Sequence, residues 1–468
     1  MKNYKIVDMT VGSPLKHILI FTIPLVIGNI FQQLYNMVDS IVVGQYVGKA
    51  ALAAVGACGS MNFLFFSLSF GLSNGVGILV SHRFGAKDEE GIRKTISSAY
   101  FVLTTVSLII TAIAFFLAPV LLRLLDTPSS IINDSISYIR VTCLGILGIT
   151  LYNGVAASLR ALGDSRTPLY FLIFSSIMNI VLDLVLVINF NMGVVGVALA
   201  TVISQYASAV VAFIYAFRNV EYFELTKEAF KPDMDYVKQE IRLGVPLSLQ
   251  SSMIAFSCLV LQGVVNSFGE NVVAAFTITS RVEQLVQQPY NSIGTALMTY
   301  SGQNIGARKI DRVKKGFRQS AGIVAVFSVL MIAVMYIFGK NISGIFVSDS
   351  EVINMSYTAL KITSPFYFAL GMIYVPRSLL NGCGDTGFAM INGITEVAGR
   401  ILFSQLFLYF GLFGFWSVWV TTSATWALTS VVCMMRFFSG AWMRGVKEEQ
   451  VYRRKLKLSV PNIAIKRA

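Results

Sequence analysis

Two aspartates lie within long apolar stretches of this sequence and have no basic residue near them. Asp39 lies near the end of the first such stretch, and Asp183 near the end of a later one. An ionised carboxylate at the centre of a bilayer costs about 2.5 to 3.5 kcal/mol on insertion scales, so it needs a cation, a proton or a partner. Side chains that carry oxygen accompany both acids: Asn36, Asn179 one turn before Asp183, and Thr201 in the next stretch.

Two kinds of chemistry fit this group. A hard monovalent cation needs several oxygen ligands, and a proton carrier needs a carboxyl group whose pKa is raised by burial or by another acid. We therefore interpret Asp39, Asn179, Asp183 and Thr201 as a cation-coupling site, with Na⁺ and H⁺ both open. Asn153 is a weaker member, because a buried amide that satisfies a backbone group explains it equally well. The alternative is a pair of permanently protonated, hydrogen-bonded aspartates.

A second group of charged residues lies further along the chain and contains both signs. Glu283 lies in one apolar stretch, and Glu396 and Arg400 lie in another, four residues apart. That spacing places both on one face of a helix and permits an ion pair. A structural pair is the simpler interpretation, although an acid in a central cavity would also attract a cationic substrate. Together with Tyr35 and Asn36, these three residues are our candidates for a substrate cavity.

The elements that hold these residues must be membrane-spanning helices. The chain of 468 residues is 55% hydrophobic and only 13% charged, against roughly 25% charged in an ordinary soluble domain. Long apolar stretches recur from Leu15 to Arg436, and each can cross a hydrocarbon core about 30 Å thick as a helix. The predicted fold class is an all-α polytopic membrane protein with twelve transmembrane helices, among them single helices over 138–159 and 359–380.

The basic residues predict how the chain is oriented. They concentrate in alternate connecting segments, at the N-terminus and in the C-terminal tail, and the positive-inside rule then places both termini in the cytoplasm. The formal net charge of +13 therefore reflects topology and contact with anionic membrane lipids. A nucleic-acid partner is the weaker interpretation. The string at 44–50 that comes nearest to a phosphate loop is one residue too short, so no nucleotide site is predicted.

The sequence also repeats itself at a fixed offset of 221 residues. This offset pairs Gly85 with Gly306 and Gly163 with Gly384, whereas Pro24 meets Pro246 only at an offset of 222, so one gap is needed. Two parallel repeats of six helices are typical of transporters. The predicted division is an N-terminal six-helix lobe over 1–217, a cytoplasmic linker over 218–243, a C-terminal six-helix lobe over 244–437 and a basic cytoplasmic tail over 438–468.

Several features together resemble the multidrug and toxic compound extrusion (MATE) family, over about residues 10 to 440. They are the helix count, the two parallel lobes, Pro24 followed after fourteen residues by Asp39, Asn179-x3-Asp183, and the segments Gly-Gln-Tyr-Val-Gly at 44–48 and Arg-Phe-Gly-Ala-Lys at 83–87. The resemblance is closer to the DinF-like branch than to the NorM-like branch, because residues 244–265 contain no acid.

What this resemblance implies is secondary active efflux of small organic, commonly cationic, compounds from the cell by antiport with Na⁺ or H⁺. It also implies two lobes that rock to give alternating access, a location in the cytoplasmic membrane, no enzymatic activity and no cofactor. In the DinF-like branch the residues that match Asp39, Asn179, Asp183 and Thr201 form the cation site, with Asn153 as a neighbour. No metal is expected beyond Na⁺ at that set.

Two alternatives remain at this stage. A flippase of a lipid-linked precursor has the same broad architecture, but its polyanionic cargo favours a cavity with unpaired Arg or Lys, and the unpaired charges that we place inside the membrane are acidic. Arg160 is placed in an inner loop in this interpretation. A membrane-embedded enzyme or receptor is the second alternative, and no metal motif, nucleophile motif or large soluble domain in the sequence supports it.

Overall fold

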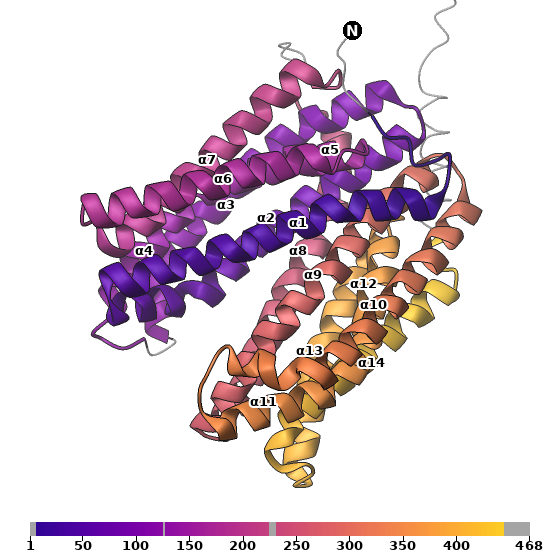
Figure 1. Ribbon diagram of the computed structural model, residues 1–468. Coiled ribbons are helices and arrows are strands. Elements are labelled where there is room, and N and C mark those ends of the chain that lie inside the picture. Colours follow the sequence, from indigo (N-terminus) through magenta and orange to yellow (C-terminus); the bar gives the residue numbers. More distant parts are fainter. Residues whose placement is uncertain (1–5, 125–126, 224–230, 444–468) are drawn as a thin grey trace, which may run out of the picture.

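The computed structural model describes residues 6–124, 127–223 and 231–443, which are almost entirely helical (Figure 1). The first lobe contains α1 (Pro14–Val42), α2 (Lys49–Gly85), α3 (Glu89–Leu124), α4 (Ile132–Leu144), α5 (Ile146–Ala161), α6 (Arg166–Leu184) and α7 (Gly193–Asn219). The second lobe contains α8 (Met234–Asn266), α9 (Glu270–Gly306), α10 (Ile310–Gly344), α11 (Ser350–Thr363), α12 (Tyr367–Gly382), α13 (Gly387–Tyr409) and α14 (Ser417–Phe438).

These helices build the predicted all-α fold with two lobes. Within the described ranges, nine helical segments are long and apolar enough to cross a membrane by themselves. The remaining crossings are α9, the broken pair α11 and α12, and α13. Two of these carry the charged residues of the second lobe, since Glu283 lies on α9 and Glu396 and Arg400 lie on α13.

The structure corrects the two single helices predicted over 138–159 and 359–380. The first is divided into α4 and α5 at Gly145, and the second into α11 and α12 at a short 3₁₀ turn, Ser364–Phe366. A Cβ atom at Gly145 would lie 2.2 Å from Oε1 of Gln205, so a larger residue there would displace the end of that side chain. In the second lobe Pro365 lacks a backbone N–H and disfavours a continuous α-helix. The breaks fall at equivalent positions of the sequence repeat.

The two lobes meet at one end, which we call the closed end, and diverge toward α4 and α11 (Figure 1). Backbones at the closed end are almost in contact: a Cβ atom at Gly85 would lie 1.9 Å from the carbonyl oxygen of Gln303, and one at Gly306 would lie 2.1 Å from that of His82. His82 also bonds through Nε2 to the carbonyl of Gly382, at 2.7 Å. At the other end, a Cβ atom at Gly48 or Gly269 would meet no atom within 4 Å.

The predicted linker over 218–243 is shorter than expected. Helix α7 continues to Asn219 and α8 already begins at Met234, where Asp233 caps it by accepting a hydrogen bond from the backbone N–H of Asp235. Side-chain capping satisfies a free donor of the first helical turn and so fixes the start of the helix. Residues 224–230 of the linker and residues 444–468 of the predicted tail lie outside the described part of the chain.

Candidate cation site and cavity of the first lobe

The two aspartates of the first lobe come together from α1 and α6. Asp183 is fully buried and Asp39 is half-buried, and their carboxyl groups lie close enough to interact with each other. A π turn follows each acid: η1 (Val43–Val47) follows α1, and η2 (Val185–Asn189) follows α6. Single π turns occur frequently at functional sites. The two acids therefore occupy matching places, each just before an irregular helix end.

Few hydrogen-bond donors reach the oxygen atoms of this cluster. Within the described residues, neither carboxylate oxygen of Asp183 has a hydrogen-bond partner, and the same holds for Oδ1 of Asp39 and Oδ1 of Asn179. The Asn179 amide donates to Oγ1 of Thr201 at 3.5 Å, and Thr201 donates to the carbonyl of Val197 at 3.1 Å. Buried polar atoms without partners are costly. Because the orphaned atoms are all acceptors, this cluster is suited to a cation or a proton.

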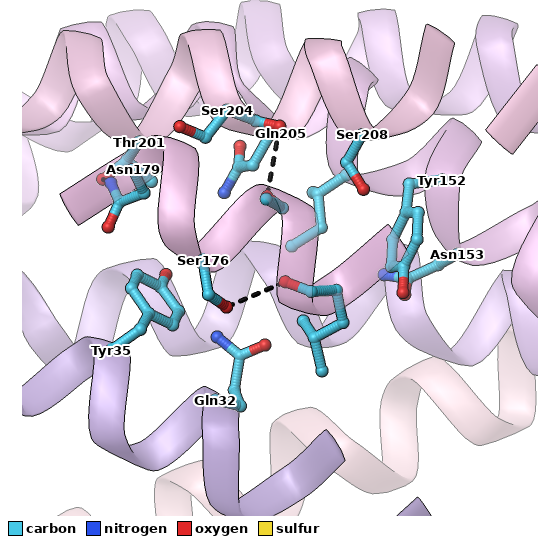
Figure 2. Close-up of a pocket in the computed structure, with 13 residues that line it drawn as sticks. Gln32, Tyr35, Tyr152, Asn153, Ser176, Asn179, Thr201, Ser204, Gln205 and Ser208 are labelled. Carbon is cyan, nitrogen blue, oxygen red and sulfur yellow. Dashed lines mark hydrogen bonds between the residues drawn. The ribbon is translucent and has the colours of Figure 1, made fainter. Parts of the chain in front are cut away.

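A polar cavity lies beside the acids, one helical turn away along α1 and α6 (Figure 2). It leaves about 80 Å³ for the centres of water-sized particles, which is room for several of them. Thirteen residues from α1, α5, α6 and α7 line it: Gln32, Tyr35, Ile149, Tyr152, Asn153, Leu172, Ser175, Ser176, Asn179, Thr201, Ser204, Gln205 and Ser208. The lining contains hydroxyl and amide groups but no charged side chain.

The predicted cation-site residues fall into different parts of this region. Asn179 and Thr201 lie at one end of the cavity, and Asn153 lies at the other end beside Tyr152 (Figure 2). Asp39 and Asp183 do not line the cavity itself. The cluster that could hold one cation therefore consists of the two acids with Asn179 and Thr201, and Asn153 belongs to the cavity wall.

Two candidates for the substrate cavity share α1 but have different surroundings. Tyr35 is half-buried and lines the cavity, whereas Asn36 is exposed and is not part of its lining. The reason for this correction is geometric, because successive residues of an α-helix are rotated by about 100° from each other. Only one of the two can face α6.

Sequence reasoning missed several residues of this cavity and its surroundings. They include Gln32, Tyr152, Ser176, Ser204, Gln205 and Ser208, together with Tyr138 of α4, which interacts electrostatically with both aspartates. A signal for most of them was present. Polar residues recur every three or four positions on α1, α6 and α7, as in Thr201, Gln205 and Ser208, which marks one helix face within an apolar stretch.

The charged residues of the second lobe form an internal cluster. Nη2 of Arg400 lies 3.3 Å from Oε1 of Glu396, and Nη1 of Arg400 lies 3.5 Å from Sγ of Cys258. Arg400 also interacts electrostatically with Glu283. All three charged residues are buried, with at most 9% of each exposed. The i,i+4 pair therefore forms, and in this conformation its carboxylate is occupied by a guanidinium.

Two parallel lobes of membrane helices, closed at one end and with a cavity inside one lobe, are typical of a membrane transporter. The family model MatE matches residues 24–185 and 246–406, one stretch in each lobe. The chain belongs to this family, the multidrug and toxic compound extrusion transporters. Its members are ion-coupled, multi-pass membrane antiporters that need no cofactor.

Known relatives resemble the chain over nearly its full length. "Probable multidrug resistance protein YpnP" of Bacillus subtilis (strain 168) is 32% identical over 418 residues, covering 89% of this chain and 88% of that protein. A solved MOP superfamily transporter from Pyrococcus furiosus aligns with a TM-score of 0.87 at 25% identity, over 94% of this chain and 99% of that one. The outward-facing conformation of a multidrug resistance MATE family transporter aligns equally well, over 95% and 100%.

Proposed function

We propose that this protein exports small organic, commonly cationic, compounds across the cytoplasmic membrane in exchange for H⁺ or Na⁺. The observation that carries the proposal is the cluster of buried oxygens around Asp39 and Asp183, because the orphaned oxygens accept no hydrogen bond and meet no basic side chain among the described residues. Relatives described as multidrug resistance proteins support the substrate class. The neutral, partly aromatic lining of the cavity beside the acids is suited to contact with an organic group.

The acids supply the coupling. In the absence of a cation, two adjacent carboxylates repel each other and lack partners, so binding one H⁺ or one Na⁺ stabilises their arrangement. An ion drives the cycle only if it binds one conformation more tightly than the other. We infer that loading of this cluster changes the relative stability of the two lobe arrangements and thereby the access of the cavity.

The basic residues of the closed end support an orientation. In one lobe Arg83 lies on the last turn of α2 and Lys87 in the connection that follows it. In the other lobe Arg308 and Lys309 lie in the connection that follows α9. The positive-inside rule then assigns the closed end to the cytoplasm. In this orientation both termini are cytoplasmic, and the conformation described here is open toward the outside.

Single amide substitutions test the coupling site. We expect Asp39→Asn and Asp183→Asn each to abolish gradient-driven efflux of a fluorescent organic cation from proteoliposomes, because an amide cannot bind a proton or balance a cation. Folding should survive, since an amide and a carboxyl group have nearly the same shape. The matched control is Asp134→Asn, an exposed acid on α4, which should transport like the wild type.

Imposing a Na⁺ gradient or a pH gradient separately then identifies the coupling ion. Gradient-driven efflux by both cluster variants at the wild-type rate would refute the proposed site. Transport of a fluorescent lipid-linked precursor, without transport of any organic cation, would refute the proposed substrate class and favour a flippase.

A further inference from the structure

Arg160 is a basic residue at the junction of the lobes, and it has no partner among the described residues. The sequence predicts an inner loop for Arg160, but the residue lies on the last turn of α5 and is half-buried. No carboxylate of the described residues forms an ion pair with it, and no described side chain or carbonyl accepts a hydrogen bond from its guanidinium. Tyr152 is the ionisable group that interacts with it, and the Tyr152 hydroxyl already donates to the carbonyl of Pro168 at 3.1 Å.

A charge in this setting needs compensation. Arginine stays protonated in proteins and has five N–H donors and no acceptor. Within a membrane protein such a group is expensive unless it meets an anion, a carbonyl or water. Arg400, which is buried, meets this need by pairing with Glu396. Arg160 forms no such ion pair with a described residue.

The guanidinium faces a small cavity lined by further donors. Asn74, Gly77, Ile78, Ser81, Ala157, Met298 and Thr299 complete its wall. The side chains of Asn74 and Thr299 have no hydrogen-bond partner within the described ranges, whereas Ser81 donates to the carbonyl of Ile78 at 2.8 Å. An amide NH₂, a hydroxyl group and a guanidinium therefore converge on one space, and the wall contains no carboxylate. The charged group of this set is a guanidinium, opposite in sign to the two acids of the cluster around Asp183.

The cavity lies where the lobes touch. Asn74 and Arg160 belong to α2 and α5 of the first lobe, and Thr299 belongs to α9 of the second. Immediately beside it, the side-chain amide of Gln303 donates across the lobe boundary to the carbonyl of Ala161 at 2.8 Å. A ligand here would contact both lobes at the closed end.

We propose that this cavity is an anion site that takes one small monovalent anion of the halide class and so stabilises the closed end. The cavity leaves about 10 Å³ for the centre of a water-sized particle, which admits one such particle and no organic acid. The guanidinium supplies the charge, and Asn74 and Thr299 supply neutral donors from opposite lobes. Because the anion bridges the lobes only when they are in contact, its binding favours the conformation closed at this end.

Replacing chloride by gluconate at constant ionic strength tests the proposal on the purified, full-length protein in detergent. We expect chloride and bromide to raise the Tm saturably, and we expect the chloride concentration at half-effect to increase about tenfold or more in Arg160→Gln, the loss expected for a hydrogen bond to a charged group. Arg160→Lys should retain a weakened response. The control is Arg123→Gln, an exposed arginine on α3, which should respond like the wild type.

Two further measurements keep the test decisive if Arg160→Gln does not fold. Asn74→Ala and Thr299→Val should each weaken the response to chloride, and crystals soaked in bromide should give an anomalous peak beside Arg160. A wild-type protein whose Tm does not respond saturably to any halide would overturn the proposal, as would an unchanged response in Arg160→Gln or in both neutral variants. Because no transport is measured, this outcome is independent of the coupling mechanism proposed above.

Discussion

The buried acids of the two lobes differ in their neighbouring side chains. Glu396 has Arg400 one turn away on the same helix, at 3.3 Å. Asp183 has Asp39, a second acid, and an amide whose donor points to Thr201. An acid with its own guanidinium is neutralised within the protein, whereas a pair of acids is neutralised only from outside. We therefore expect ion exchange to use the second arrangement.

This difference predicts that substitutions in the two lobes fail in different ways. Glu396→Gln should lower the Tm and the expression level, because removing one partner of a buried pair costs about 3 to 5 kcal/mol when the other charge is left unpaired. Since Arg400 keeps its contacts with Cys258 and Glu283, we expect the lower part of that range.

Thermal unfolding of the purified variant measures the effect, with the exposed Glu270→Gln as control. The double variant Glu396→Gln/Arg400→Gln should lose less stability than the sum of the two single variants. Wild-type stability of Glu396→Gln together with lost coupling would show instead that Glu396 takes part in ion exchange.

At the scale of elements, the break between α4 and α5 positions part of the cavity wall. Gly145 leaves space for the end of Gln205, which lines the cavity from α7. We expect Gly145→Ala to fold, because the side chain of Gln205 can move, and to displace its carboxamide. The KM for substrate or ion should then rise up to about tenfold, because the loss of one hydrogen bond weakens binding by about that factor.

Transport assays at varied substrate and ion concentrations measure this change. Gly322→Ala is the matched control, since a Cβ atom there would meet nothing within 4 Å. A Tm far below that of the control, without a change in KM, would indicate that Gly145 serves packing and not the cavity.

Local patterns in the sequence predicted the local features of these elements. The spacing of Glu396 and Arg400 was sufficient to predict their pair, because i and i+4 residues are neighbours on any helix. The acid pair was recognised because both residues interrupt apolar stretches. The position of Arg160 between the lobes was not predictable in this way, since it depends on how α5 packs against α2 and α9. The division of two long helices could not be predicted from Gly145 and Pro365, because glycine and proline also occur frequently within transmembrane helices.

At the scale of the whole molecule, glycine backbones bring the lobes into contact. Gly85→Val should prevent this approach, because a side chain there meets the Gln303 backbone, which cannot move aside as a flexible side chain can. The lobes should then shift toward the opposite arrangement. Spin labels at Lys49 and Glu270, which begin α2 and α9 at the open end, should report shorter distances than in the wild type.

The control for this prediction is Gly56→Val on the same helix, because a Cβ atom at Gly56 would meet nothing within 4 Å. Unchanged label distances in folded Gly85→Val protein would show that contacts other than the glycine approach set the lobe arrangement.

The π turn η1 explains a difference between the sequence repeats of the two lobes. Pro24 and Gly48 are separated by one residue more than their counterparts, Pro246 and Gly269. A π turn takes up one residue more than an α turn, so η1 accounts for this insertion. The first lobe thus differs from the second by one inserted residue, shortly after Asp39.

The twin positions of the coupling residues show how far that divergence extends. With the one-residue shift, the counterpart of Asp39 is the buried Leu261, and the counterpart of Asp183 is the buried Ser404. The counterpart of Asn179 is Arg400, the guanidinium of the second-lobe ion pair. The two repeats have therefore diverged at these positions: the first lobe has the acids that we propose to exchange a cation, and the second has an arginine paired with Glu396.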